Sequence, residues 1–266
     1  MSQQSSNNTY KSRELLSALA AYDLWFYLAW LDIRLRYRRS KIGPLWITIS
    51  MAVFCVLLGA VYSQLWKADI AEYLPFLSVG YVMWMLFSSM LADFPNLYVD
   101  NASFLKDIKI NPLTILFRVV ARNVLTFLHN ALIIVGIYLY FKIVPGIVVL
   151  LVFPGLLLVL LNLVAIGVSL SIIGARFRDI TQITLSVIQI LFFVTPIMYF
   201  PRLVKSNSWV LAVNPFAYYL DLVRSPLLGS SPAPRSWIAA TLTLVLLGIF
   251  AAWLYERKSH RIQFWV

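Results

Sequence analysis

Five basic side chains close together are the residues of this sequence best suited to bind an anion. They stand just before an uncharged run that extends from Leu45 to Leu65, and we call them the basic segment: Arg34, Arg36, Arg38, Arg39 and Lys41. Arginine binds phosphate through two parallel hydrogen bonds, so this segment could hold a phosphate group. Basic residues beside a membrane span also mark its cytoplasmic side, and that role alone would explain them.

A second set of polar residues falls on one side of an apolar run. Its members recur at steps of four and three, as on one face of a helix: Gln182, Ser186, Gln189 and Phe193. Glutamine side chains turned toward lipid would be costly, so this face must meet water or another helix. Pore lining and hydrogen bonding between helices both fit the pattern.

Motifs for nucleotide hydrolysis, dinucleotide binding and zinc catalysis do not occur in the sequence. The apolar runs contain no aspartate or glutamate, which ion-coupled transporters place near the middle of the membrane. His129 stands alone within these runs, which indicates a hydrogen-bonded packing residue and not a metal ligand. We therefore expect no catalytic residue, no metal and no cofactor on this chain.

The composition is that of an integral membrane protein. Hydrophobic residues make up 61% of the 266 positions and charged residues only 12%, with a mean hydropathy of +0.81. A water-soluble domain of this size could not cover its surface with so few polar side chains. The net charge of +11 comes in short blocks between apolar runs, which indicates membrane topology and argues against nucleic acid as a partner.

Six apolar runs are long enough to cross a membrane as helices. They cover about 44–66, 74–92, 118–141, 147–173, 182–200 and 237–255. An even number of crossings puts both termini on one side, and placing that side in the cytoplasm leaves most of the 22 lysines and arginines inside. The sequence thus predicts an all-α membrane protein in which residues 42–266 form a six-helix domain with cytoplasmic termini.

Residues 1–41 are predicted to form a cytoplasmic tail followed by an amphipathic helix. Apolar residues recur at helical spacing from residue 12 to residue 40, but charged residues interrupt them too often for a span. Such a helix lies in the membrane interface, where it could be a simple anchor or could handle a substrate.

Two further segments lie between the runs. Within 93–111, Asn101 or Ser103 could cap a short helix that ends before Pro112 and presents Phe104, Leu105 and Ile108 to the cytoplasm, as a polar connector or as a docking element. The segment 201–235 contains five prolines and is predicted to form short helices that dip into the outer half of the membrane or lie on it. Asn214 and Pro215 are a favourable start for one of them.

Several of these segments together resemble one family. They are the stretch LRYRRSKIGPLW at 35–46, the loop helix before Pro112, ARFRDI at 175–180, and VNPF at 213–216 through LVR at 222–224. They resemble the membrane subunit of bacterial ABC exporters for polysaccharides, the Wzm-like group that serves O antigen, capsule and teichoic acid. The resemblance extends from about residue 30 to the end and includes the basic segment.

The resemblance implies a homodimer in the bacterial inner membrane that encloses a continuous channel. Two copies of a separate subunit would bind ATP and Mg²⁺, and an undecaprenyl-linked polysaccharide would be the substrate. The helix at about 100–111 would be the coupling helix, and 201–235 a periplasmic gate. The contacts with the ATP-binding subunit would come from Asp100, Asn101, Ser103, Phe104, Leu105, Lys106, Asp107 and Ile108. The basic segment would lie where the lipid pyrophosphate enters.

A channel for a hydrated glycan needs aromatic faces for sugar rings and hydrogen-bonding groups for hydroxyls. The candidates are Tyr62, Tyr81, Trp84, Gln182, Ser186, Gln189, Phe193 and Tyr199. Each aromatic could instead belong to the membrane belt or to the core.

The leading hypothesis is export of a lipid-linked polysaccharide, driven by a separate ATPase. The alternatives are an exporter of drugs or small lipids, a membrane-bound transferase that uses acidic residues on the outer side, and a channel that needs no nucleotide. Lipid-linked polymer on the cytoplasmic face of a deletion strain would favour export, and absence of polymer at every stage would favour synthesis.

Overall fold

The computed structural model describes residues 14–36, 38, 45–108, 110–203 and 209–266, and within them it contains helices and no strands. Its long helices are α2 (Tyr22–Arg36), α3 (Leu45–Leu65), α4 (Ile70–Asp93), α7 (Pro112–Phe141), α8 (Val152–Arg176), α9 (Asp179–Val194) and α12 (Pro234–Lys258). Its shorter helices are α5 (Leu97–Asp100), α6 (Ala102–Lys106), η1 (Ile147–Leu151), α10 (Trp209–Val213), α11 (Pro215–Leu227) and α13 (Ile262–Trp265).

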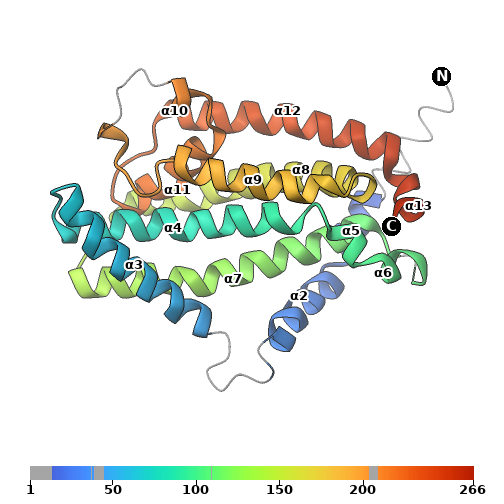
Figure 1. Ribbon diagram of the computed structural model, residues 1–266, viewed down its shortest axis with the longest axis horizontal. Coiled ribbons are helices and arrows are strands. Elements are labelled where there is room, and N and C mark those ends of the chain that lie inside the picture. Colours follow the sequence, from blue (N-terminus) through green and yellow to red (C-terminus); the bar gives the residue numbers. More distant parts are fainter. Residues whose placement is uncertain (1–13, 37, 39–44, 109, 204–208) are drawn as a thin grey trace.

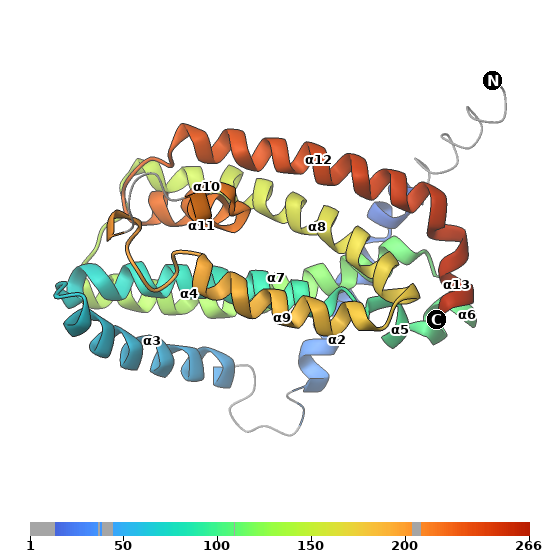
Figure 2. The same ribbon diagram turned by 45° about the horizontal axis from the view of Figure 1, so that its top comes forward.

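The long helices form an elongated bundle whose two ends differ. Helices α4, α7, α8, α9 and α12 run along its long axis, with α5, α6 and α13 at one end and α10 and α11 toward the other (Figures 1 and 2). At the α6 end, the Tyr255 hydroxyl donates to the Glu14 carboxylate at 3.3 Å. The first and last described parts of the chain therefore lie at the same end.

Five of the described helices are long and apolar enough to cross a membrane, against six runs expected from the sequence. The fifth run forms α9, which has only 16 residues and so rises about 24 Å, less than the apolar thickness of a bilayer. The expected run extended to residue 200. Helix α9 stops earlier because Pro196 disfavours the helical conformation at Thr195, whose ψ is 136°.

Close packing at the α6 end depends on small side chains of α8. A Cβ atom built on Gly174 would come within 2.1 Å of the Pro95 carbonyl oxygen, so only glycine fits there. Ser171 and Ala175 on the same helix are also buried. This contact holds the segment between α4 and α5 against α8.

The predicted amphipathic helix is present, as a helical stretch at 14–20 followed by a turn and α2. Helix α2 packs obliquely on α7 (Figure 1) and buries Ala29 and Ile33. Its tyrosines and tryptophans at positions 22, 27 and 30 are exposed. Exposed aromatic side chains next to charged ones suit the membrane interface, and that location stays a prediction.

The loop helix differs from the expectation for 100–111. Two short helices, α5 and α6, meet at Asn101, whose side chain makes no cap and instead donates to the Leu97 carbonyl at 2.8 Å. Pro112 does not end a helix but begins α7, with Asn111 as its cap. Leu105 is fully buried, so of the three apolar residues expected to face outward only Ile108 does so, with 63% of it exposed. The expectation was wrong because the bundle covers one side of α6.

The segment 201–235 contains the short helices that its prolines predict. The Asn214 side chain accepts a hydrogen bond from the Phe216 N–H at 3.0 Å, and Pro215 occupies the first turn of α11. This local prediction is confirmed. Whether α10 and α11 dip into a membrane stays a prediction.

Candidate functional site

Ion pairs join α2, α4 and α7 near the α6 end of the bundle. Arg118 of α7 binds Asp32 of α2 through two hydrogen bonds, Nη2 to Oδ1 at 2.6 Å and Nε to Oδ2 at 2.9 Å. One turn further along α7, Arg122 lies 2.7 Å from Asp93 of α4 and 3.8 Å from Asp32. Bidentate pairs of this kind are short and fix geometry, so they hold α2 in a defined position on the bundle.

Arg118 also reaches the loop helices α5 and α6. The Arg118 Nη1 donates to the Asn101 side-chain oxygen at 3.2 Å, and its guanidinium lies 5.2 Å from the centre of the Phe104 ring. Arg118 therefore contacts α2 on one side and the α5–α6 segment on the other.

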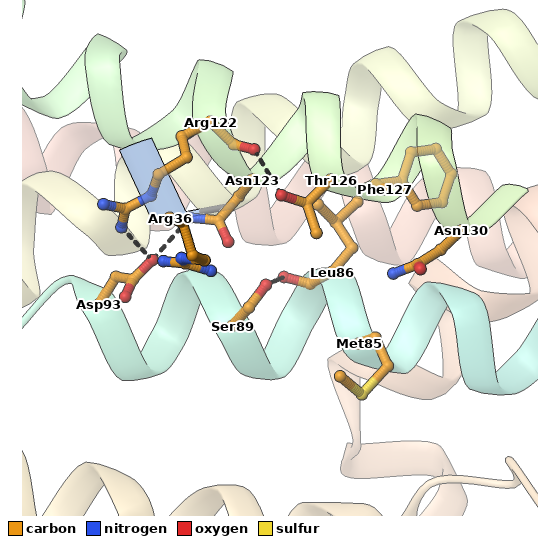
Figure 3. Close-up of a pocket in the computed structure, with 10 residues that line it drawn as sticks. All are labelled: Arg36, Met85, Leu86, Ser89, Asp93, Arg122, Asn123, Thr126, Phe127 and Asn130. Carbon is orange, nitrogen blue, oxygen red and sulfur yellow. Dashed lines mark hydrogen bonds and ion pairs between the residues drawn. The ribbon is translucent and has the colours of Figure 1, made fainter. Parts of the chain in front are cut away.

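A pocket of about 240 Å³ opens beside these ion pairs, between α4 and α7 (Figure 3). One end is charged, with Arg36, Asp93 and Arg122. Asn123 donates to Asp93 at 2.7 Å, and at the far end Asn130 points into the space between the helices, as Figure 3 shows. Met85, Leu86 and Phe127 supply apolar wall. The arrangement suits a ligand with an anionic group and hydroxyls, because it offers guanidinium donors and amides.

The basic segment is divided by α2. Arg36 lines the pocket with Arg122, whereas Arg34 and Arg38 line a separate open hollow with Leu31 and Leu35. All three described arginines are exposed. Arg39 and Lys41 lie outside the described residues.

The polar face of α9 is exposed along its length. Gln182, Ser186, Gln189 and Phe193 all lie on the surface of the protomer. The Ser186 hydroxyl donates back to the Gln182 carbonyl at 3.1 Å, within the same helix. The structure thus brings these four predicted residues together on one unpartnered side.

The aromatic channel candidates are dispersed. Trp84 is 4% exposed and packs against Phe87, Phe192 and Phe216, so in this protomer it belongs to the core. Tyr81 stacks on Phe54 with ring centres 4.4 Å apart. Tyr62 and Tyr199 are half-buried, and the Tyr199 hydroxyl donates to the Val194 carbonyl at 2.9 Å.

The residues expected to contact an ATP-binding subunit divide by exposure. Those on the surface are Asp100, Ser103, Lys106, Asp107 and Ile108. Asn101 and Phe104 are half-buried beneath Arg118, and Leu105 is an anchor in the core.

Side-chain contacts hold the non-helical stretch after α9, and the sequence pattern does not predict them. Arg224 of α11 is 5% exposed, donates to the Pro196 carbonyl at 2.6 Å, and lies 4.0 Å from the centre of the Phe76 ring. The Tyr73 hydroxyl donates to the Met198 carbonyl at 2.6 Å. The available signal was Pro196, which frees backbone groups that other side chains must then satisfy.

The pocket was also missed, although part of its pattern is visible along α7. Arg118, Arg122, Thr126 and Asn130 recur every four residues and so share one side of the helix. Their partners, Asp32 and Asp93, come from α2 and α4, and the sequence does not show that these helices meet.

The apolar bundle, with its five helices long enough to cross a membrane, indicates a multi-pass membrane protein. The chain belongs to the ABC-2 type transporter family, whose model matches residues 23–228. Its curated relatives include two proteins named O-antigen export system permease protein RfbA from Klebsiella pneumoniae, 25% and 24% identical over 201 residues, which are 74% of this chain and 76% of each relative. A protein of the same name from Myxococcus xanthus is 23% identical over 188 residues, 69% of this chain and 72% of the relative.

Family membership confirms the resemblance drawn from the sequence and the assignment to a multi-pass membrane protein. Members of this family are transport subunits that typically work with a separate ATPase.

Proposed function

We propose that this chain is the channel-forming membrane subunit of an exporter that moves a lipid-linked polysaccharide from the cytoplasm to the periplasm. Two copies would sit in the inner membrane with two copies of a separate subunit that binds and hydrolyses ATP. The substrate would be an undecaprenyl-linked glycan of the O-antigen type. The names of the curated relatives support this substrate class.

The observation that carries the proposal is the exposed polar face of α9. In lipid, each amide without a partner would cost several kcal/mol, on the order of a lost hydrogen bond or more. Gln182 and Gln189 lie on the outer surface of the single protomer. A passage lined by this face becomes enclosed only when a second copy covers it, and closed two-fold symmetry is the commonest way to do this.

The two ends of the bundle differ, which supports a cytoplasmic side at the α6 end and a periplasmic side at the end with α10 and α11. With α9 as a short sixth crossing, both termini lie in the cytoplasm, and the α6 end faces the ATP-binding subunit. The exposed residues of that end, among them Lys106, Asp107 and Ile108, would form the docking surface. Helices α10 and α11 then form the periplasmic gate, held through Arg224.

The test deletes the gene in its host and restores either the native chain or a variant. Gln182→Leu combined with Gln189→Leu removes the amides of the α9 face, and Gln64→Leu is the matched control because it removes an exposed glutamine on α3. We expect lipid-linked polymer to accumulate on the cytoplasmic face with the double variant and to be exported with the control.

Each other outcome contradicts part of the proposal. Normal export by the double variant would refute the role of the α9 face. Absence of polymer at every stage in the deletion strain would indicate synthesis, and export that survives inactivation of the ATP-binding subunit would indicate a channel that needs no nucleotide. If the deletion strain lost export of drugs or small lipids but exported polymer normally, these smaller molecules would be the substrates of this protein.

A further inference from the structure

We propose that the pocket between α2, α4 and α7 is a binding site for the phosphate ester of a hydroxylated headgroup. The inference rests on the proposed function in so far as the headgroup belongs to the exported lipid. The ligand chemistry is shared by the sugar phosphate of a polyprenyl carrier and by the glycerol phosphate of an ordinary phospholipid. The carrier is the source that the proposed function predicts.

The charged end of the pocket favours an anion. Two guanidinium groups, Arg36 and Arg122, line it against one carboxylate, Asp93. Arg122 is already paired with Asp93 at 2.7 Å, whereas among the described residues no ion pair is formed by Arg36. One positive charge therefore stays unbalanced, and arginine is the side chain whose donors best match phosphate.

The other end of the pocket contains a polar group without a partner. Asn130 is 2% exposed, and its side-chain oxygen has no hydrogen-bond partner among the described residues. A buried acceptor without a hydrogen bond costs about 1–3 kcal/mol of stability, so a donor is expected at this position. Figure 3 shows its amide pointing into the space between α4 and α7, where a ligand hydroxyl would supply that donor.

The distance between the two ends matches a small headgroup. Arg122 and Asn130 are two turns apart on α7, which is about 12 Å along the helix. The pocket volume of about 240 Å³ equals roughly eight water molecules in the liquid. This is room for a phosphate and one hydroxylated group. Apolar wall from Met85 and Phe127 suits the carbon face of a sugar or glycerol.

The site also touches the linkage to the loop helices. Arg122 lies 3.8 Å from Asp32, whose carboxylate is bound by Arg118, and Arg118 contacts Asn101 and Phe104. A phosphate that draws Arg122 toward it would change the charge around Asp32. Occupancy of the pocket could in this way be sensed at α6.

The experiment measures binding to the complete complex in nanodiscs of zwitterionic phosphatidylcholine, without ATP. The probe is a short-chain polyprenyl diphosphate that carries one sugar, detected by native mass spectrometry. Phosphatidylglycerol and free sugar 1-phosphate are the competitors. The variants are Arg36→Gln and Asn130→Leu, and Arg34→Gln is the comparison because it removes the same charge from the other side of α2.

We expect Arg36→Gln and Asn130→Leu each to weaken probe binding about tenfold or more, because each removes a hydrogen bond to the ligand. Arg34→Gln should weaken it by about threefold at most, because Arg34 lines a separate hollow and does not line the pocket. Asn130→Leu should leave the thermal stability unchanged or raise it, since it replaces a buried side chain whose oxygen is unpaired with an apolar group of similar volume. Loss of binding without loss of stability separates a ligand site from a structural residue.

Competition assigns the source of the headgroup. Displacement of the probe by phosphatidylglycerol at equal concentration would assign the pocket to a phospholipid, and failure to displace would assign it to the carrier. Equal weakening by both arginine variants, with no effect of Asn130→Leu, would overturn the proposal in favour of general attraction to α2. Because no ATP is present, the binding measurement does not depend on export, so failure of this proposal can be distinguished from failure of the proposed function.

Discussion

The ion pair between Asp32 and Arg118 can be tested by Asp32→Asn, which keeps the size of the side chain and removes its charge. The pair forms two hydrogen bonds, and its side chains are only 16% and 17% exposed. Hydrogen bonds to charged groups contribute about 1.5–3 kcal/mol each, and asparagine can retain one of the two. We therefore expect a loss of about 2 kcal/mol in the free energy of unfolding.

A double-mutant cycle isolates the contribution of the pair. Asp32→Asn, Arg118→Gln and the double variant are compared by chemical unfolding of the complex in detergent, and the expected coupling energy is about 1–3 kcal/mol. The control is Glu72→Gln, which opens the Glu72–Arg202 pair of 3.0 Å at the other end of the bundle. Those side chains are 54% and 64% exposed, so the control should change stability by about 0.5 kcal/mol or less.

The functional readout is the ratio of polymer exported to ATP hydrolysed. Asp32→Asn leaves Arg118 on Asn101 and Phe104 but weakens its connection to α2, so ATP hydrolysis should continue while export falls. A coupling energy below about 0.5 kcal/mol, or an unchanged ratio, would show that Arg118 does not connect α6 to α2.

The remaining predictions concern packing at the α6 end. Leu105→Ala should cost about 2–5 kcal/mol of stability because Leu105 is fully buried, whereas Ile108→Ala should leave stability nearly unchanged and weaken binding of the ATP-binding subunit; the reverse pattern would invalidate the placement of α6. Gly174→Ala should lower the melting temperature because the added Cβ would lie 2.1 Å from the Pro95 oxygen, and Gly136→Ala, with no atom within 4 Å, should be neutral or stabilising. Equal effects of the two alanines would argue against this helix contact.

Sequence and structure agree where local chemistry decides the outcome. The cap at Asn214 depends on its own side chain and on Pro215, so it could be predicted, as could the long apolar helices. The buried side of α6 could not, because Leu105 and Ile108 are equally apolar and only the surrounding bundle distinguishes them. The length of α9 was overestimated because hydropathy continues past Pro196 while the helix does not.

The candidate site shows the same limit more strongly. The α9 face is periodic along one helix, so its members could be grouped from the sequence. The described arginines of the basic segment are neighbours in the sequence, but they line two separate hollows. The pocket joins Arg36, Asp93 and Asn130 from three helices, and charges far apart in the chain reveal nothing of their distance in space. Only the spacing of Arg118, Arg122 and Asn130 on α7 hinted at a shared side.

The stretch after Val194 is fastened by side chains and not by a ladder of main-chain bonds. Arg224 and Tyr73 each satisfy one carbonyl there, at Pro196 and Met198. Water molecules can donate hydrogen bonds to both carbonyls in place of these side chains, and the helices can stay intact. If this segment belongs to the proposed periplasmic gate, a hydrated glycan would bring the water that replaces these two hydrogen bonds, and its own arrival would loosen the gate.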